Sequence, residues 1–206
     1  MDYKKTLEEI LYASIGAKEN ALENLSDRII QAAQMLSESL LAERKILLCG
    51  EGTGSLDAQR FASQLVNGFE MERSALPALV LGAGLPITPS TTDDNTDADI
   101  FIKQLETLAE SGDLLIVIGN DLSTSRLNKT IRFALSKEIA VLMISGKIGR
   151  QDKEGTNKED KLLDAIEDGK CLQLPVAGGK IARVQETHLL IINILCYLVE
   201  KEIFSG

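Results

Sequence analysis

The fold is decided by the stretch Lys45-Ile46-Leu47-Leu48-Cys49-Gly50-Glu51-Gly52-Thr53-Gly54-Ser55. Its first five residues form a short apolar run, typical of a strand that is buried on both faces. The glycine-rich turn that follows leads directly into a helical pattern over Leu56–Phe69. A strand that passes through such a turn into a helix predicts the opening unit of a parallel α/β sheet.

The rest of the chain repeats this alternation of strand and helix. The further predicted strands are Pro77–Leu81, Leu114–Ile118, Ala140–Ile144 and Cys171–Pro175, and the further predicted helices are Asp99–Glu110, Ser125–Ser136 and about 181–203. We therefore expect an α/β fold with a five-stranded parallel sheet, doubly wound as a three-layer αβα sandwich.

The two remaining segments lie outside this alternation. Residues 1–43 predict an N-terminal pair of helices used in oligomer packing, with Ser26-Asp27 as the cap of the second helix. Residues 44–206 form the α/β domain, and the whole chain is expected to be one structural unit. The charged segment Arg150–Lys170 predicts a long connection in which Lys161–Glu167 forms a short helix.

The composition narrows the possible functions. The chain has 206 residues and a net charge of −9, which disfavours direct nucleic-acid binding because phosphate neutralisation needs clustered cations. Three widely spaced cysteines and the lack of a targeting or membrane-spanning segment favour a cytoplasmic protein. One histidine and scattered cysteines predict no metal site, and no cofactor is expected.

Three motifs are candidates for chemistry. The loop Gly50–Ser55 is either an anion site at a helix N-terminus or a tight turn, and Glu51 would repel a phosphate. The loop Gly119–Ser125 carries hydroxyls that either hold a phosphate or cap the next helix. His188 shares a predicted helix face with Gln185, and it is either a catalytic group or a hydrogen-bonded core residue.

Taken in order, these segments resemble the sugar isomerase (SIS) domain family. The resemblance rests on the first strand and glycine loop, Asp57-Ala58-x-x-Phe61-Ala62, Pro77-Ala78, Gly112-Asp113-Leu114-Leu115, Ser145-Gly146 and Arg183-Val184-Gln185-Glu186-x-His188. With the N-terminal helices, the chain resembles the sedoheptulose 7-phosphate isomerase branch and its relative, the DnaA initiator-associating branch.

The resemblance implies an aldose–ketose isomerisation that needs a general base and a general acid. The family's base position is Gln64 here, its acid position is Asn193, and the aspartate before the last motif is Ala182. The phosphate-binding serines fall on Gly54 and on Gly119-Asn120-Asp121. A metal that some members bind would meet Arg60, Gln64, Gln185 and Asn193, a poor ligand set.

Some ligand contacts are nevertheless expected to persist. The expected sugar-phosphate contacts are Gly52, Thr53, Ser55, Asp94, Ser123, Thr124 and Gln185. Near the C-terminus, Ile203 and Phe204 either form a partner-binding anchor or pack on their own helix.

The changes at the base, acid and phosphate positions lead to the main functional expectation. With these changes, the resemblance to the initiator-associating branch implies a non-catalytic homotetramer that binds the replication initiator DnaA and promotes its assembly at the origin. The alternative is phosphoheptose isomerase in heptose biosynthesis, with acid and base supplied from His188, Asp94, Asp57 or Glu51. A third possibility is a sensor that binds a sugar phosphate without converting it.

Overall fold

The computed structural model describes residues 2–83, 96–122, 125–146 and 170–205. Along the chain the elements are α1 (Tyr3–Leu41), β1 (Ile46–Gly50), α2 (Thr53–Asn67), β2 (Ala78–Val80), α3 (Thr96–Leu108), β3 (Leu114–Gly119), α4 (Ser125–Ser136), β4 (Ala140–Gly146), β5 (Cys171–Val176) and α6 (Ile181–Phe204). This order confirms the α/β class. The predicted helix at Lys161–Glu167, with most of its connection, lies outside the described residues.

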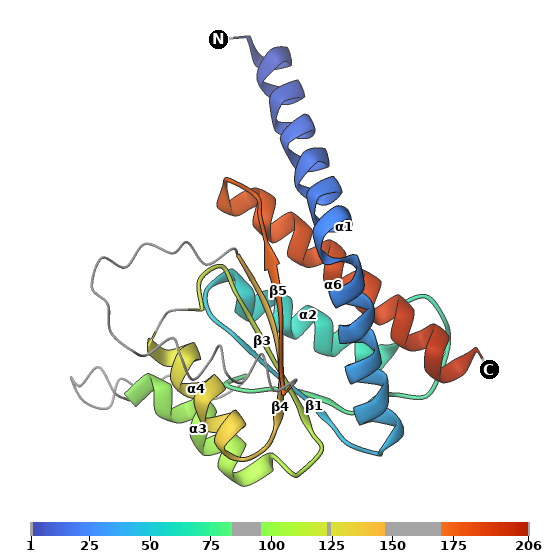
Figure 1. Cartoon of the computed structure of the whole chain (residues 1–206), viewed down its shortest axis with the longest axis vertical. Coiled ribbons are helices and arrows are strands. Elements are labelled where there is room, and N and C mark those ends of the chain that lie inside the picture. The colour runs from blue at the N-terminus through green and yellow to red at the C-terminus, as the bar shows by residue number, and fades with distance from the viewer. Residues whose placement is uncertain (1, 84–95, 123–124, 147–169, 206) are drawn as a thin grey trace.

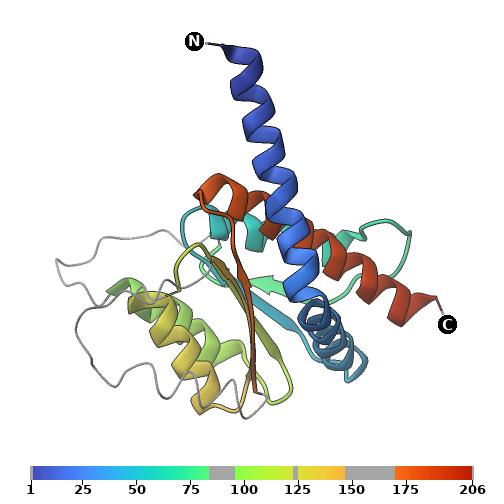
Figure 2. The ribbon, with the colours of Figure 1, turned by 45° about the horizontal axis from the view of Figure 1, so that its top comes forward.

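The five strands form one parallel sheet in the order β2-β1-β3-β4-β5. Successive strand residues point to opposite faces, so each strand contributes to two separate cores. Leu48 and Ile116 pack with α1, α2 and α6 on one face, whereas Cys49 and Val117 pack with α3 and α4 on the other. Figure 2 shows the sheet nearly edge-on between these two helical layers. The doubly wound sandwich is therefore confirmed.

The strand order reverses between β1 and β3, because the chain leaves β1 for β2 on one side and later returns to β3 on the other. Ligands of open α/β sheets bind at the carboxyl ends of the strands beside such a reversal. In this chain that edge carries the turn after β1 and the segment between β3 and α4 (Figure 1).

The N-terminal helix pair is the one part of the predicted architecture that is wrong. Residues 3–41 form a single helix, α1, with Asp2 as its N-cap. Ser26 does not cap a second helix, because its hydroxyl donates back to the carbonyl of Leu22 in the preceding turn. That residues 1–43 form a separate unit used in oligomer packing stays a prediction.

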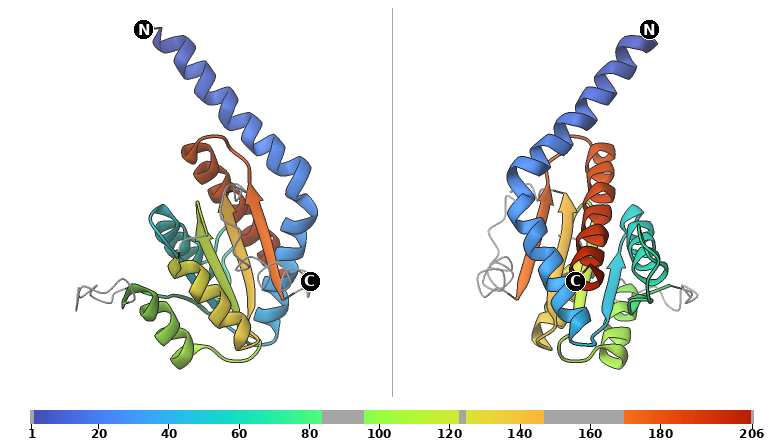
Figure 3. Two further views of the ribbon diagram at one scale, coloured as in Figure 1. Left: turned by 60° about the vertical axis from the view of Figure 1, so that its left-hand side comes forward. Right: turned by 90° about the vertical axis from the view of Figure 1, so that its right-hand side faces the viewer.

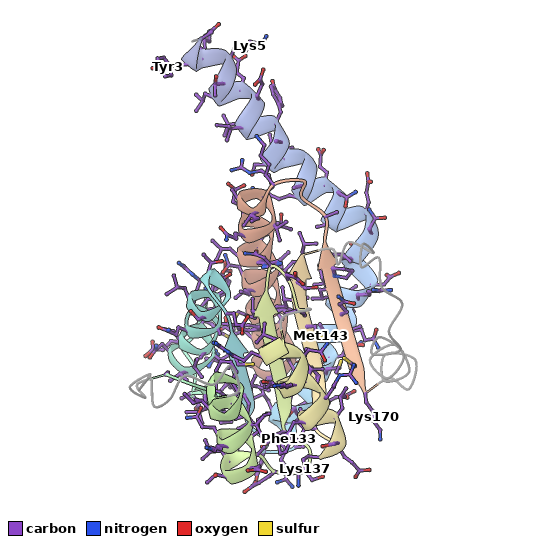
Figure 4. All side chains as sticks on the ribbon, turned by 90° about the vertical axis from the view of Figure 1, so that its left-hand side faces the viewer. Tyr3, Lys5, Phe133, Lys137, Met143 and Lys170 are labelled. Atoms are coloured by element: carbon purple, nitrogen blue, oxygen red, sulfur yellow. The ribbon has the colours of Figure 1, made fainter. Side chains whose placement is uncertain are left out.

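Helix α1 packs on the domain from its second quarter onwards, and the Ile10 carbonyl and the Ser14 hydroxyl already bond to Arg183 and Glu186 of α6. Its buried side chains begin at Ala17 and continue to Leu40. The N-terminal turns project beyond the rest of the molecule (Figures 1 and 3), and Tyr3 and Lys5 lie at the free tip (Figure 4). Within the described ranges, no helix combines the length and hydropathy that crossing a membrane requires.

Candidate functional site

A cavity of about 510 Å³ opens at the carboxyl ends of β1 and β2. Its polar side is the turn and first helical turns of α2, with Glu51, Gly52, Ser55 and Gln59. Its apolar side is formed by Leu81, Ile100 and Phe101, and Arg126 reaches it from the first turn of α4. A cavity of this size is in the range of small-molecule sites.

Two opposite charges meet in this cavity. Nε of Arg126 lies 3.3 Å from Oε1 of Glu51, and both side chains remain partly exposed. The glutamate that the sequence suggested would repel a phosphate is therefore neutralised by a guanidinium from a segment 75 residues away along the chain (126 − 51). Sequence reasoning missed Arg126, because nothing near it in the chain signals this pairing.

The glycine-rich loop between β1 and α2 is pressed against β3. A Cβ atom at Gly54 would lie well inside contact distance of the Ile118 carbonyl oxygen. The N–H of Gly54 donates to the carbonyl of Glu51 (2.9 Å) and that of Ser55 to the carbonyl of Gly52 (3.2 Å). Two donors of the helix N-terminus are therefore already used, as the tight-turn interpretation expects.

The adjoining surface is the seam between α2 and α6, which two side-chain hydrogen bonds cross. Gln185 Nε2 donates to Thr53 Oγ1 (2.7 Å). Lower down, Gln64 Nε2 donates to Asn193 Oδ1 (3.0 Å). The structure thus brings together the predicted base and acid positions, but as a hydrogen-bonded pair of amides that carries no titratable proton.

Asp57 lies on this seam between the two cross-helix hydrogen bonds. Thr53, Asp57 and Gln64 are four and seven residues apart on α2, so they share the face that meets α6. The Asp57 side chain is half-buried, and burial raises the pKa of its carboxyl although the Arg60 guanidinium works in the opposite direction. A carboxylate with a raised pKa is a suitable general base.

His188 does not share the seam with Gln185. It is 1% exposed, and its Nε2 has no hydrogen-bond partner among the described residues. Burial lowers the pKa of His188, outweighing the hydrogen bond to the Ser145 backbone that works to raise it. The imidazole is therefore a neutral core group, which supports the structural interpretation of this residue.

The seam does not fit a metal ion. The four positions that the resemblance names offer one guanidinium and three neutral amide side chains, of which Gln64 and Asn193 already bond each other. The neighbouring Cys196 thiol donates to Gln64 Oε1 (3.4 Å), and burial raises its pKa to about 12, so it stays protonated. Neutral amides and a protonated thiol are weak ligands for the transition metals that such a site would hold.

The lower end of α2 is held by a buried ion pair that sequence reasoning also missed. Arg73 Nε lies 2.9 Å from Glu200 Oε1, and both side chains are 2% exposed. Glu200 also accepts the N–H groups of Phe69 and Glu70, while Arg73 donates to the carbonyl of Gln64. The pair therefore anchors the backbone of the residue at the predicted base position.

The predicted partner-binding residues Ile203 and Phe204 differ in burial, since Phe204 is exposed, and their role in binding a partner stays a prediction. The Arg73 guanidinium lies 5.4 Å from the centre of the Phe204 ring, and Ile203 packs against the core beneath α6. Three predicted contacts, Asp94, Ser123 and Thr124, lie outside the described residues. Gly52 and Ser55 line the cavity, and Thr53 and Gln185 lie on the seam; their role as ligand contacts stays a prediction.

Comparison with known proteins places this site in a family. The SIS domain model matches residues 12–146. A phosphoheptose isomerase of Halorhodospira halophila is 32% identical over 206 residues, which cover 100% of this chain and 98% of that protein. One from Alkalilimnicola ehrlichii is 33% identical over 195 residues, covering 95% and 94%.

Solved structures give the same result. A phosphoheptose isomerase from Francisella tularensis superposes with a TM-score of 0.81 at 28% identity, covering 98% of this chain and 100% of that chain. The enzyme from Neisseria gonorrhoeae gives a TM-score of 0.80 at 25% identity, covering 97% and 99%.

These findings overturn the main functional expectation from the sequence. The DnaA-binding adaptor is wrong as the leading interpretation, because the relatives that match along the whole chain are named phosphoheptose isomerases. The amide substitutions at Gln64 and Asn193 had suggested lost catalysis, but they show only that those two positions carry no base or acid. The chain belongs to the SIS domain family, in its phosphoheptose isomerase branch.

Proposed function

We propose that the protein is an aldose–ketose isomerase that interconverts sedoheptulose 7-phosphate and D-glycero-D-manno-heptose 7-phosphate. The proposal is supported by relatives of this name that match the whole chain. The structural observation that carries it is the half-buried Asp57 carboxylate on the seam between α2 and α6. A cavity of sugar size opens at the N-terminus of the same helix, α2.

Asp57 has the properties that the proton transfer requires. In the ketose-to-aldose direction its carboxylate takes a proton from C1, the C–H electron pair forms the C1–C2 double bond, and the C2 carbonyl electrons move to the oxygen, which gives an enediolate. A proton then passes from the C1 hydroxyl to the C2 oxygen, and the carboxylic acid returns its proton to C2 as the C1 carbonyl forms. The raised pKa of Asp57 brings the carboxyl closer to the working pH, where one group can both take and return a proton. Its neighbour Arg60 supplies positive charge for the enediolate oxygen.

Gln64 and Asn193 have a supporting role in this proposal. Their amide–amide hydrogen bond joins α2 to α6 one and a half to two turns below Asp57. Together with the Thr53–Gln185 contact it fixes the spacing of the helices on either side of the carboxylate. Such preorganisation keeps a catalytic group within reach of its substrate.

The test is a coupled isomerase assay with sedoheptulose 7-phosphate. Wild-type protein is expected to form the aldose, and Asp57→Asn is expected to lower kcat by about 10²- to 10⁴-fold, the usual contribution of a general base. Asp27→Asn, which changes an exposed aspartate on α1, is the matched control and should keep wild-type activity. Full turnover by Asp57→Asn would refute the role of Asp57, and no turnover by wild type would refute the enzyme.

The amide pair favours one second candidate, a protein that binds a sugar phosphate without converting it. Gln64 and Asn193 occupy the positions at which the family resemblance places the base and the acid. In this case sedoheptulose 7-phosphate would raise the melting temperature, since it binds the native state, while the assay would detect no aldose.

Self-association as a homotetramer in the cytoplasm completes the proposal. The projecting part of α1 exposes apolar side chains at spacings of three and four residues: Tyr3, Leu7, Ile10, Leu11 and Ile15. Such a face is stabilised by packing against another copy of the helix. Light scattering should show a tetramer for wild type and a smaller species for Leu11→Asp, whereas a wild-type monomer would refute it.

A further inference from the structure

Arg126 occupies a position that helix energetics disfavour. It is the second residue of α4, where the positive end of the helix dipole repels a cation. The first turn of α4 carries no acidic residue, and Arg126 pairs with Glu51 from the loop after β1. A guanidinium held there beside a cavity calls for an explanation other than helix stability.

Apart from Arg126, the described residues that line the cavity offer little that binds an anion. The opposite wall is apolar, with Leu81, Ile100 and Phe101. At the N-terminus of α2, the N–H groups of Gly54 and Ser55 are already used within the turn. The hydroxyl of Ser55 donates to the carbonyl of Gly52 (2.7 Å), so it too is engaged inside the loop.

The pair of charges is nevertheless open to exchange. Arg126 and Glu51 keep 37% and 23% of their side chains exposed, unlike the 2% of the buried Arg73–Glu200 pair. A phosphate monoester carries more negative charge than a carboxylate and offers oxygen atoms that match the guanidinium fork. It would therefore compete with Glu51 for Arg126.

We infer that Arg126 is the phosphate-binding residue of this cavity and that Glu51 is its resident counter-ion, which the phosphate of a sugar phosphate displaces. The inference rests on the proposed function, since it takes the isomerase's own substrate as the ligand. It places phosphate recognition on a side chain of α4, because two N–H donors at the N-terminus of α2 already form hydrogen bonds within their own turn.

This assignment connects the cavity to the catalytic seam. Gly52 lines the cavity, and a Cβ atom there would meet nothing within 4 Å, so the space above it is open. The next residue, Thr53, already belongs to the seam, and Asp57 follows one turn later, about 6 Å along the helix axis. Asp57 is not among the residues that line the cavity, so a sugar held by its terminal phosphate at Arg126 has to pass over Gly52 and Thr53 for its carbonyl end to reach Asp57.

Isothermal titration calorimetry tests the inference, with sedoheptulose 7-phosphate, unphosphorylated sedoheptulose and inorganic phosphate as probes. Arg126→Gln is expected to weaken binding of the sugar phosphate by about 10- to 100-fold, as for loss of a charge-assisted hydrogen bond. Glu51→Gln is expected to tighten it by about two- to fivefold, because the competing carboxylate is gone. Arg132→Gln, on the same helix and bonded to Asn128, is the matched control and should bind as wild type.

Ligand exchange predicts that the affinity falls in Arg126→Gln and rises in Glu51→Gln. If the two residues formed only a structural ion pair, both variants would bind the sugar phosphate more weakly. Binding of inorganic phosphate that follows the same order supports the assignment, and unphosphorylated sedoheptulose should bind equally to wild type and Arg126→Gln. Wild-type affinity in Arg126→Gln, or weaker binding in Glu51→Gln, overturns it. Calorimetry measures binding and does not depend on turnover. The expected order of affinities without any aldose formation would therefore refute the isomerase activity alone. Turnover by Arg126→Gln with an unchanged KM would refute the phosphate site alone.

Discussion

Replacing Glu200 by glutamine should reveal how strongly the lower end of α2 is held. The carboxylate accepts the N–H of Phe69 (2.7 Å), the N–H of Glu70 (3.0 Å) and Nε of Arg73 (2.9 Å). Glutamine keeps the shape but removes the charge, which leaves the Arg73 guanidinium buried without its counter-ion. Removing one partner of a buried pair costs about 3–5 kcal/mol, or roughly 6–20 °C in melting temperature for a chain of this size.

Urea unfolding of wild type and Glu200→Gln measures this cost. Glu110→Gln is the matched control, because Glu110 pairs with Arg44 and Lys45 while 67% of its side chain is exposed. Exposed pairs contribute about 0–1 kcal/mol, so the control should unfold close to wild type. A loss below 1 kcal/mol in Glu200→Gln would refute the view that this pair anchors α2.

The difference in the free energy of unfolding between wild type and Glu200→Gln should depend on pH, and the sign of this dependence can be stated. Burial works to raise the pKa of Glu200, but the N–H groups of Glu70 and Phe69 and the charge of Arg73 outweigh it and lower the pKa below 4.5. A lowered pKa in the folded state stabilises the protein above the unfolded value and loses this effect as the pH falls through the folded value. The stability gap between wild type and Glu200→Gln should therefore be full near neutral pH and shrink below about pH 4.5.

Three further outcomes are expected. In urea unfolding, Gly54→Ala should destabilise the protein by about 1–3 kcal/mol, because its Cβ meets the backbone of β3. Gly16→Ala, in open space on α1, should stabilise it by about 0.5–1 kcal/mol. Equal effects of the two variants would contradict the close packing of Gly54. The acid limb of kcat/KM should lie above pH 3.8, since the pKa of Asp57 is raised and its carboxylate protonates on the acidic side; a limb at or below that value would exclude Asp57 as the base. Phe204→Ala should lower the melting temperature by the loss of about 0.5–1 kcal/mol of cation–π energy with Arg73, and an unchanged value would mean that the ring does not stabilise its own chain.

The strands and their sheet were predictable from the sequence. Runs such as Leu114–Ile118 are apolar on both faces, and only a strand covered by helices on both sides buries such a run. The N-terminal helix is a case that local sequence signals do not decide. Ser26-Asp27 has the residue types of a cap, but the same hydroxyl that caps a helix also bonds back into one, and the contacts of α1 with the domain decide between them.

The candidate site also combines features that could be predicted from the sequence with features that could not. The glycine loop, Gln185 and the amides at Gln64 and Asn193 were identifiable in the sequence, because each lies at a recognisable distance from a strand end or a motif. The adaptor interpretation rested on the changes at the base, acid and phosphate positions, and it gave no weight to the burial of Asp57. The raised pKa of Asp57 depends on how deeply the seam buries it, and no local pattern carries that information.

By itself, the sequence determined the fold class, the family and the edge of the sheet at which the cavity opens, because strand periodicity and turn chemistry are local properties. Only the tertiary structure decided which charges meet there. Arg126 pairs with Glu51 and Arg73 with Glu200, although the partners lie 75 (126 − 51) and 127 (200 − 73) residues apart in the chain. Electrostatic interactions depend on distance and burial in space, and both arise only when β1 is placed beside β3 and α2 beside α6.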